Sequence, residues 1–227
     1  MNNLFYTSYV SGDTLLLEGQ EAVHCALVLR KKVGDIIYVI DGNGNRYKCG
    51  IDKLSKRDVD CTILSKESQA KSEHITIAIA PTKNRDRLEW MIEKLAEIGV
   101  ERIVLMNTSN TERTRTNMER LHKKVVSAVK QSLRFYIPEV VEMDYIEVLK
   151  LTSSEKYIAH CFQTMTKENH ELTNHELTSK LILIGPEGDF STTEVEQAFA
   201  AGFKGLDLGE FRLRTETAAI VAVTRFQ

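Results

Sequence analysis

The chain has 227 residues and a formal net charge of −2, and 42% of its residues are hydrophobic and 27% charged. This length allows one large domain, or a small domain followed by a medium one, and the composition is that of a soluble globular protein. No apolar run is long enough to span a membrane and residues 1–10 are too polar for a secretion signal, so we expect a cytoplasmic protein. Because the overall charge is negative, a nucleic-acid partner would have to bind local basic patches.

Residues 1–70 are expected to form short strands joined by turns, which is the pattern of a small β-barrel or sandwich. A cluster of turn residues at 41–45 predicts a hairpin. The polar stretch 67–73 is the expected linker to the next domain. The strands are expected at 14–17, 36–40, 47–51 and 59–64, with one or two helical turns at 21–29.

Three consecutive cations, Arg30, Lys31 and Lys32, precede a turn at Gly34-Asp35. Such a triplet can bind phosphates, but it also occurs on solvated surfaces without a partner. The residues alone leave both interpretations open.

From Ile75 onward, strands alternate with helices, which predicts a parallel α/β sheet. Helices are expected at 84–98, where Gly99 is a candidate C-cap, and at 117–133. Strands are expected at 75–80, 103–106, 140–141, 157–159 and 181–184.

Two features of this half bear on ligands. Residues 113–134 carry seven cations and the single acid Glu119, an excess large enough to attract polyanions. The polar segment 167–180 contains a tandem NHELT repeat and is expected to be a surface insertion.

The two histidines of this repeat are five residues apart, so they are not expected to bind a metal together. The four cysteines of the chain show no CxxC spacing, so neither a zinc site nor a disulfide framework is expected.

The C-terminal segment 181–227 contains two strand-turn-helix units. The first is an apolar strand, a break at Gly185-Pro186-Glu187-Gly188, and a helix that begins at Ser191 with a capping box. The second is the apolar run 205–208, a break at Gly209, and a helix that follows residues 214–217. In parallel sheets, ligands bind outside the carboxyl ends of strands, so these two turns are expected to close over one small molecule.

Neither turn fits a phosphate-binding pattern, and Glu187 and Asp189 would repel a phosphate. A cationic or neutral ligand held by main-chain groups is therefore the better functional interpretation. The alternative is an ordinary tight turn with a helix cap.

The motifs GPEG at 185–188 and LG…LRTETA at 208–218 resemble the two C-terminal signatures of the SPOUT-class methyltransferases. More specifically, the chain resembles the bacterial 16S ribosomal RNA uridine-N3 methyltransferase family, and the resemblance runs along nearly its whole length. Other motifs that match the family are Lys83-x-Arg85, Lys94-x-x-Glu97-Ile98-Gly99, Gln131-Ser132-x-Arg134 with Pro138, and, near the N-terminus, His24 to Asp35 with Asp41-Gly42 and Gly44.

This resemblance implies an α/β fold with two domains. A PUA-like β-barrel that binds RNA would span residues 1–70, and a SPOUT-type parallel sheet with a deep trefoil knot would span residues 74–227. The class also works as homodimers whose sites are completed at the interface.

The resemblance further implies that S-adenosyl-L-methionine is the methyl donor and that N3 of a uridine in 16S ribosomal RNA, free or in the assembled small subunit, is the acceptor. The residues implied in donor binding are Ile184, Gly185, Pro186, Glu187, Gly188, Leu208, Gly209, Leu213, Arg214 and Thr217.

Transfer to N3 requires removal of a proton, and the resulting anion spreads onto O2 and O4. Arg214 and Arg134 are the expected donors to that charge, and Glu216 or Glu187 the expected base, although Glu216 has the alternative role of orienting Arg214 or capping the last helix. The residues implied in RNA binding are Arg30, Lys31, Lys83, Arg85, Arg113, Arg115, Lys124 and Arg134.

The chain departs from the family at three places: Ile98 stands where the family usually has Leu, Asp189 where it usually has Gly, and Phe211-Arg212 where it has Arg-Ile. These changes leave the RNA position that is modified open. Three other functions remain alternatives: a SPOUT enzyme with another RNA substrate, a non-catalytic RNA-binding module, and a nucleotide-binding oxidoreductase, which the missing dinucleotide fingerprint disfavours.

Overall fold

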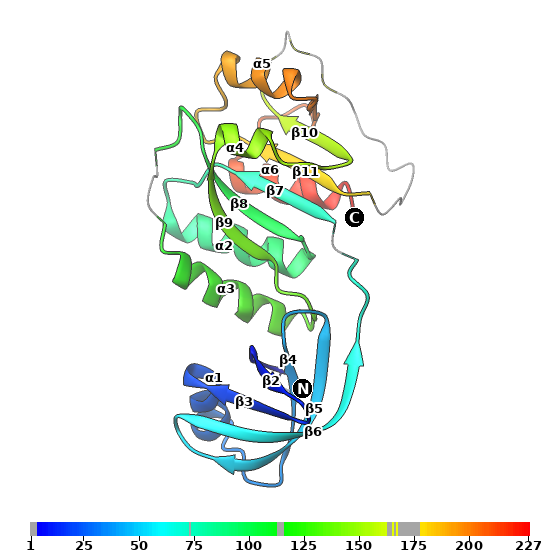
Figure 1. Cartoon of the computed structure of the whole chain (residues 1–227). Coiled ribbons are helices and arrows are strands. Elements are labelled where there is room, and N and C mark those ends of the chain that lie inside the picture. The colour runs from blue at the N-terminus through cyan, green and yellow to red at the C-terminus, as the bar shows by residue number, and fades with distance from the viewer. Residues whose placement is uncertain (1–3, 73, 113–115, 163–164, 166, 168–177) are drawn as a thin grey trace. The chain divides into compact units, whose positions relative to one another are not determined.

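The computed structural model describes residues 4–72, 74–112, 116–162, 165, 167 and 178–227. The chain divides into two compact units, one made of Met1–Lys71 with Val126–Ile137 and the other of Ser72–Val125 with Pro138–Gln227 (Figure 1). Both contain a six-stranded sheet, and the expected mixed α/β architecture is confirmed.

The first unit is a curled sheet in the order β1-β4-β5-β6-β3-β2. The pair β1–β4 is parallel and the others are antiparallel. All four expected strands are present, whereas β1 and β2, with three residues each, are too short to show a period in the sequence. The strands are β1 Leu4–Tyr6, β2 Tyr9–Ser11, β3 Thr14–Glu18, β4 Ile36–Ile40, β5 Asn45–Leu54 and β6 Asp58–Ser68.

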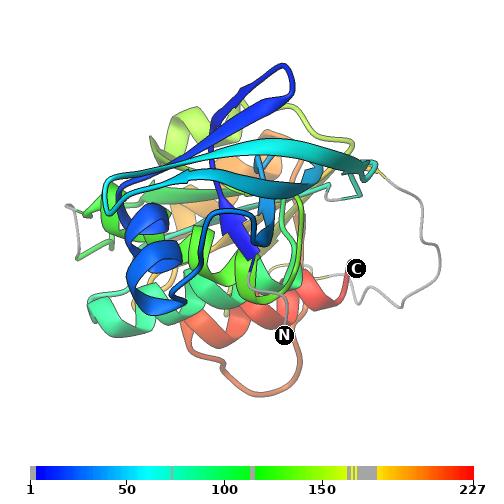
Figure 2. The ribbon, with the colours of Figure 1, turned by 90° about the horizontal axis from the view of Figure 1, so that it is seen from below.

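Alternate residues of these strands face one core, which includes Leu15, Leu17, Ile37 and Val39. The long ribbon of β5 and β6 forms much of the sheet (Figure 2). The expected linker 67–73 begins too early, because β6 continues to Ser68 and the Gln69 N–H donates to the Gly44 carbonyl at 2.8 Å.

The expected helical turns at 21–29 are confirmed as α1 Gly19–Val23, followed directly by a single π-helical segment, η1 His24–Val28. Arg30 follows in the left-handed region, with φ at 52°, and its side chain is exposed. The first unit therefore presents the basic triplet at the end of an irregular helix.

The second unit is an entirely parallel sheet in the order β12-β10-β11-β7-β8-β9. The central strands β7 and β11 are continuous apolar runs because both faces of the sheet are covered. The strands are β7 Ile75–Ile79, β8 Arg102–Asn107, β9 Glu139–Asp144, β10 Glu155–Ala159, β11 Lys180–Ile184 and β12 Lys204–Gly205.

Helices cover both faces of this sheet (Figure 1). On one face α4 and α5 pack into an apolar core, and on the other α6 packs against β7, β11 and α2. The short α4 was not expected, and the expected strand 205–208 ends at Gly205. The helices are α2 Arg85–Ile98, α3 Met118–Gln131, α4 Tyr145–Leu149, α5 Thr192–Ala200 and α6 Thr215–Thr224.

The Gly99 and Ser191 caps are those the sequence predicts, whereas Asn84, expected as the first helical residue, is the N-cap of α2. The Asn84 side chain accepts the first N–H groups of α2, and Gly99 ends this helix with φ at 100°. Ser191 and Glu194 form the expected capping box at the start of α5. Among the described residues, every helix is too short or too polar to cross a membrane.

Glu194 connects the cap of α5 to a second loop. Its buried carboxylate accepts the N–H groups of Ser109 and Ser191, each at 2.8 Å, and both serine hydroxyls at 3.0 Å. Burial raises the pKa of this carboxyl, but the four hydrogen bonds outweigh that effect and lower it below the ordinary value. Glu194 thus ties the loop after β8 to the turn that precedes α5.

We expect Glu194→Gln to lower the free energy of unfolding by about 1–2 kcal/mol at pH 7, because charged acceptors form stronger hydrogen bonds than neutral ones. Since folding lowers the pKa of Glu194, its stabilisation is present above the ordinary pKa of glutamate and is lost as the pH falls through the lowered value. Urea unfolding at pH 7 and at pH 3 measures both effects. Glu196→Gln, on the exposed side of the same helix, is the control; equal stability of the two variants at pH 7 would contradict the assignment.

Candidate active site

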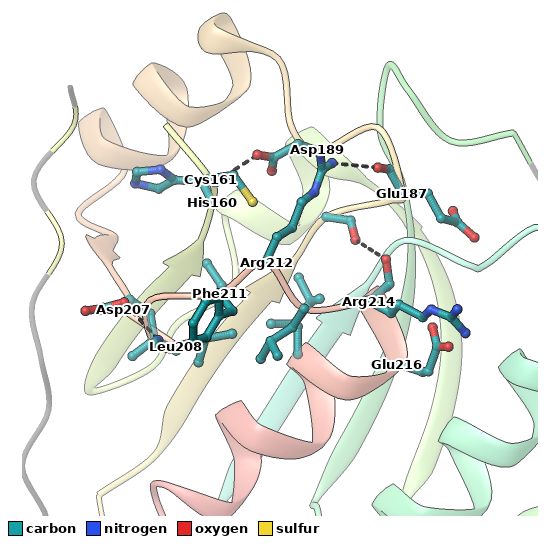
Figure 3. A pocket seen from close by; sticks show the side chains of 18 of the residues that line it. His160, Cys161, Glu187, Asp189, Asp207, Leu208, Phe211, Arg212, Arg214 and Glu216 are labelled. Carbon is teal, nitrogen blue, oxygen red and sulfur yellow. Dashed lines mark hydrogen bonds between the residues drawn. The ribbon is translucent and has the colours of Figure 1, made fainter. Parts of the chain in front are cut away.

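A cavity of about 580 Å³ lies at the carboxyl ends of three neighbouring strands of the second unit (Figure 3). Ala159 ends β10, Ile184 ends β11 and Leu206 follows β12, and all three line the cavity. This is the edge at which open parallel sheets bind their ligands.

The turn after β11 forms one wall. Gly185 lets the chain pass close to a core side chain there, because a β-carbon at this position would lie 3.0 Å from the buried ring of Phe190 and would force that ring to shift. Asp189 follows the turn with φ at 65°, in the left-handed region, and its N–H donates to the Pro186 carbonyl at 2.9 Å. Glycine adopts this conformation without strain and aspartate tolerates it, which explains how Asp189 can replace the family's Gly.

The segment Leu206–Arg214 forms the opposite wall. It is tied to the first wall by two hydrogen bonds: Arg212 Nη2 donates to the Glu187 carbonyl at 3.0 Å, and Thr215 Oγ1 donates to the Gly185 carbonyl at 3.1 Å. Gly209 bends the segment with φ at 119°. The two glycine breaks that the sequence singles out therefore face one cavity.

Most of the expected donor-binding residues lie on this cavity. Gly188 and Thr217 are exceptions: Gly188 faces Asn110, 3.5 Å from where its β-carbon would be, and Thr217 lines a separate cavity. The expected residues that line the cavity are Ile184, Gly185, Pro186, Glu187, Leu208, Gly209, Leu213 and Arg214.

The structure also adds lining residues that sequence reasoning missed. Arg87 comes from α2, and His160 and Cys161 from the end of β10. Only the sheet order reveals His160 and Cys161, because no sequence signal shows that β10 lies beside β11, and only the packing of α2 against α6 reveals Arg87. Asp189 and Phe211 also line the cavity; neither was among the expected donor-binding residues, although the charge of Asp189 argues against a phosphate ligand.

Asp189 connects the turn after β11 to the end of β10. Its carboxylate accepts the Cys161 N–H and the Phe190 N–H, both at 2.8 Å. Burial and the Asp189 carboxylate raise the pKa of the Cys161 thiol, so this thiol is not an activated nucleophile. His160 packs on Phe162 and Phe199, and burial, reinforced by Lys167, lowers its pKa and favours a neutral ring.

Arg214 and Glu216 stand where α6 begins. Arg214 is the N-cap residue, but its side chain makes no capping bond. The Glu216 side chain is mostly buried, and its Oε1 lies 3.8 Å from Arg87 Nε. The ion pair of Glu216 is thus with Arg87, a residue that the sequence did not suggest. Arg134, the other expected catalytic arginine, is half-buried in the first unit.

A basic cluster is built around the buried carboxylate of Glu89. Arg120 contacts both of its oxygens, Arg85 Nε lies at 3.1 Å and Lys124 Nζ at 3.8 Å. The hydrogen bond from Arg120 lowers the pKa of Glu89, and the nearby cations add to this shift. One carboxylate therefore holds three cations from α2 and α3 in place, with a local excess of positive charge.

The remaining expected RNA-binding residues are separate from this cluster. Lys83 pairs with Glu112 at 2.7 Å. Arg30 and Lys31 belong to the first unit, and Arg113 and Arg115 lie outside the described residues. In the described ranges, no three His, Cys, Asp or Glu side chains group in a way that could hold a metal ion. Most of the NHELT repeat also lies outside those ranges.

Comparisons with known proteins match this chain to RNA methyltransferases. The family model described as an RNA methyltransferase domain matches residues 69–227, and the model described as an RNA methyltransferase PUA domain matches residues 17–64. The Ribosomal RNA small subunit methyltransferase E of Bacillus subtilis is 26% identical over 227 residues, which cover 93% of this chain and 88% of that protein.

Two solved structures are similar over nearly the full length. A probable rRNA-methyltransferase from Porphyromonas gingivalis is 39% identical with a TM-score of 0.89, and the match covers 99% of this chain and 98% of that one. A Ribosomal RNA small subunit methyltransferase E from Neisseria gonorrhoeae, bound to S-adenosyl methionine, is 27% identical with a TM-score of 0.84, covering 99% and 96%.

We expect Thr215→Val to lower the free energy of unfolding by about 1–3 kcal/mol, because it leaves the Gly185 carbonyl without its buried donor at nearly constant side-chain volume. Thermal unfolding measures the loss, and faster amide hydrogen exchange in residues 206–214 would locate it. Thr224→Val is the matched control, since the Thr224 hydroxyl is exposed and bonds to carbonyls of its own helix. Similar melting temperatures for the two variants would show that the tie between the loops is unimportant.

Proposed function

The chain belongs to the RNA methyltransferase family, with a PUA domain ahead of the methyltransferase domain, and from this premise we propose that it transfers a methyl group from S-adenosyl-L-methionine to N3 of a uridine in 16S ribosomal RNA. The observation that carries the proposal is the cavity between two hydrogen-bonded glycine loops, which lies within the matched domain. The small-subunit methyltransferase E relatives support the substrate, and the Neisseria structure supports the donor.

The cavity suits this donor in size and charge. A volume of about 580 Å³ is typical of small-molecule sites. Its lining carries one more carboxylate than cations, which favours a cationic sulfonium. The carboxylates are Glu187, Asp189, Asp207, Glu210 and Glu216, and the cations are Arg87, Lys167, Arg212 and Arg214. We assign the adenine to main-chain groups of Gly185, Glu187, Leu208 and Leu213, with Ile184, Leu208 and Leu213 as its apolar walls. Gly188 shapes the turn from behind, against Asn110.

Bound S-adenosyl-L-methionine supplies an already activated methyl group, so the protein has to position the acceptor and stabilise charge. The N3–H of uracil is a weak acid between two carbonyls, and its loss spreads negative charge onto O2 and O4. Arg214 at the cavity wall is the group we assign to that charge. We assign Glu216 as the base, with its Oε1 3.8 Å from Arg87 Nε, and Glu187 as the other candidate.

RNA would be held by surfaces on both units. We propose that residues 1–70 form the RNA-binding domain, with Arg30 and Lys31 on phosphates, and that 74–227 form the catalytic domain with the family's trefoil knot. Arg85, Lys124 and Lys83 lie in the second unit and Arg134 in the first, and we assign them to the RNA surrounding the target. The target uridine must be unpaired, because N3 is on its Watson–Crick edge.

We further propose that the protein is a cytoplasmic homodimer, as is usual for the class, and that it acts on ribosomal RNA or on the assembled small subunit. A SPOUT enzyme acting on another RNA is the alternative that the RNA methyltransferase match leaves open.

A strain that lacks this protein should lack one 3-methyluridine in its 16S ribosomal RNA, because the proposed reaction places that methyl group on N3 of one uridine. Mass spectrometry of nuclease digests from the parent, deletion and complemented strains measures it. Loss of a methylated base from transfer RNA or from the large subunit instead would replace this proposal by the alternative.

In vitro, Arg214→Gln should lower kcat about 10²- to 10³-fold, as the loss of one donor to a developing anion does. Its affinity for S-adenosylhomocysteine, measured by calorimetry, should change little if the side chain serves the acceptor. Arg102→Gln, at the amino end of β8 and thus at the opposite edge of the sheet, is the control. Full activity of Arg214→Gln would exclude Arg214 from the charge-stabilising role.

A further inference from the structure

A second cavity, of about 720 Å³, adjoins the donor cavity within the second unit. It lies between the first turns of α2 and the start of α6, and its lining includes Trp90 and Thr217. Five residues line both cavities, namely Arg87, Arg212, Leu213, Arg214 and Glu216. The two cavities therefore share one wall, and that wall contains the charged groups assigned to the reaction.

The side chains on this wall serve the two cavities differently. Arg212 crosses to the turn at Glu187 and closes the donor side, while Arg214 and Glu216 stand at the foot of the loop, near the start of α6 (Figure 3). Within the described residues, the Arg214 guanidinium has no hydrogen-bond or ion-pair partner, although the neighbouring Arg87 pairs with Glu216. An unpaired guanidinium at the boundary of two cavities is available to an incoming ligand.

Trp90 is the feature that gives the second cavity its chemistry. It is the only tryptophan of the chain and is 47% exposed, whereas Leu88, Met91 and Ile92 beside it on α2 are completely buried. Its position three residues after Arg87 places the indole and the guanidinium on the same face of the helix. A large exposed aromatic side chain beside cationic groups is the combination that binds single-stranded nucleotides, by stacking on the base and pairing with the phosphate.

The geometry of methyl transfer requires such a neighbour. Reacting atoms must approach to about 3–3.5 Å, so the acceptor base has to occupy a site that shares a wall with the donor site. We propose that the second cavity is the acceptor subsite, in which the extruded pyrimidine nucleotide stacks on Trp90 and its N3 edge faces Arg214 and Glu216. This inference rests on the proposed function, and it identifies where the substrate binds.

Steady-state kinetics with 16S ribosomal RNA from the deletion strain tests the subsite. Trp90→Ala should raise the KM for RNA about 5- to 100-fold, the range expected for loss of one base-stacking contact, with donor affinity by calorimetry unchanged. Trp90→Phe should recover most of the loss. Ile146→Ala, on α4 and 48% exposed, is matched in exposure and lines neither cavity, so it should leave the KM unchanged.

Two results would overturn the inference. One is an unchanged KM for RNA in Trp90→Ala. The other is that Trp90→Ala dissociates the protein into smaller species in sedimentation velocity, because Trp90 would then be covered by a second protein chain.

A separate readout distinguishes failure of the subsite from failure of the proposed function. Since Trp90 is the only tryptophan, its fluorescence reports on this cavity alone. Saturable quenching by uridine 5′-monophosphate supports a nucleotide site, even if the wild-type protein methylates no RNA. Absence of quenching in a protein that methylates 16S ribosomal RNA would overturn the subsite and leave the proposed function intact.

Discussion

The active site depends on two hydrogen bonds to backbone carbonyls, from Thr215 to Gly185 and from Arg212 to Glu187. Each joins the segment before α6 to the turn after β11. Parallel strands end at the same edge of the sheet, so the loops after β10, β11 and β12 have to meet there. The strand order only brings these loops together. The two hydrogen bonds then fix the distance between the walls and so define the cavity.

Charge in the second unit is arranged around two buried carboxylates. Glu89 holds three cations from α2 and α3, and Glu216 is paired with Arg87. A buried carboxylate is costly unless it is paired, so each cation that surrounds it is held in place by that cost. Arg87 and Glu89 are two residues apart on α2, and this single helix therefore positions both the basic cluster proposed to bind RNA and the proposed base.

The sequence predicted the parts of the fold that have a strong local cause. Periodicity located the longer strands and helices, and Gly99 and Ser191 are predicted caps with a known chemistry. It missed β1, β2 and α4, which are too short for a period, and it ended β6 too early. In the site, the glycine breaks were predictable from local sequence. His160 and Cys161 were not, because only the strand order brings them to the cavity, and Arg87 was not, because it arrives through the packing of α2 against α6.

Asp189 shows how a departure from a family pattern can be absorbed. Its φ of 65° explains why the family usually has Gly at this position, since a side chain there adds strain. The carboxylate compensates by accepting two N–H groups, one of them from Cys161 at the end of the neighbouring strand. Glycine could not make that bond. The aspartate thus adds a connection between the turn after β11 and the end of β10. Gly185, Pro186 and Glu187 still line the cavity in its presence.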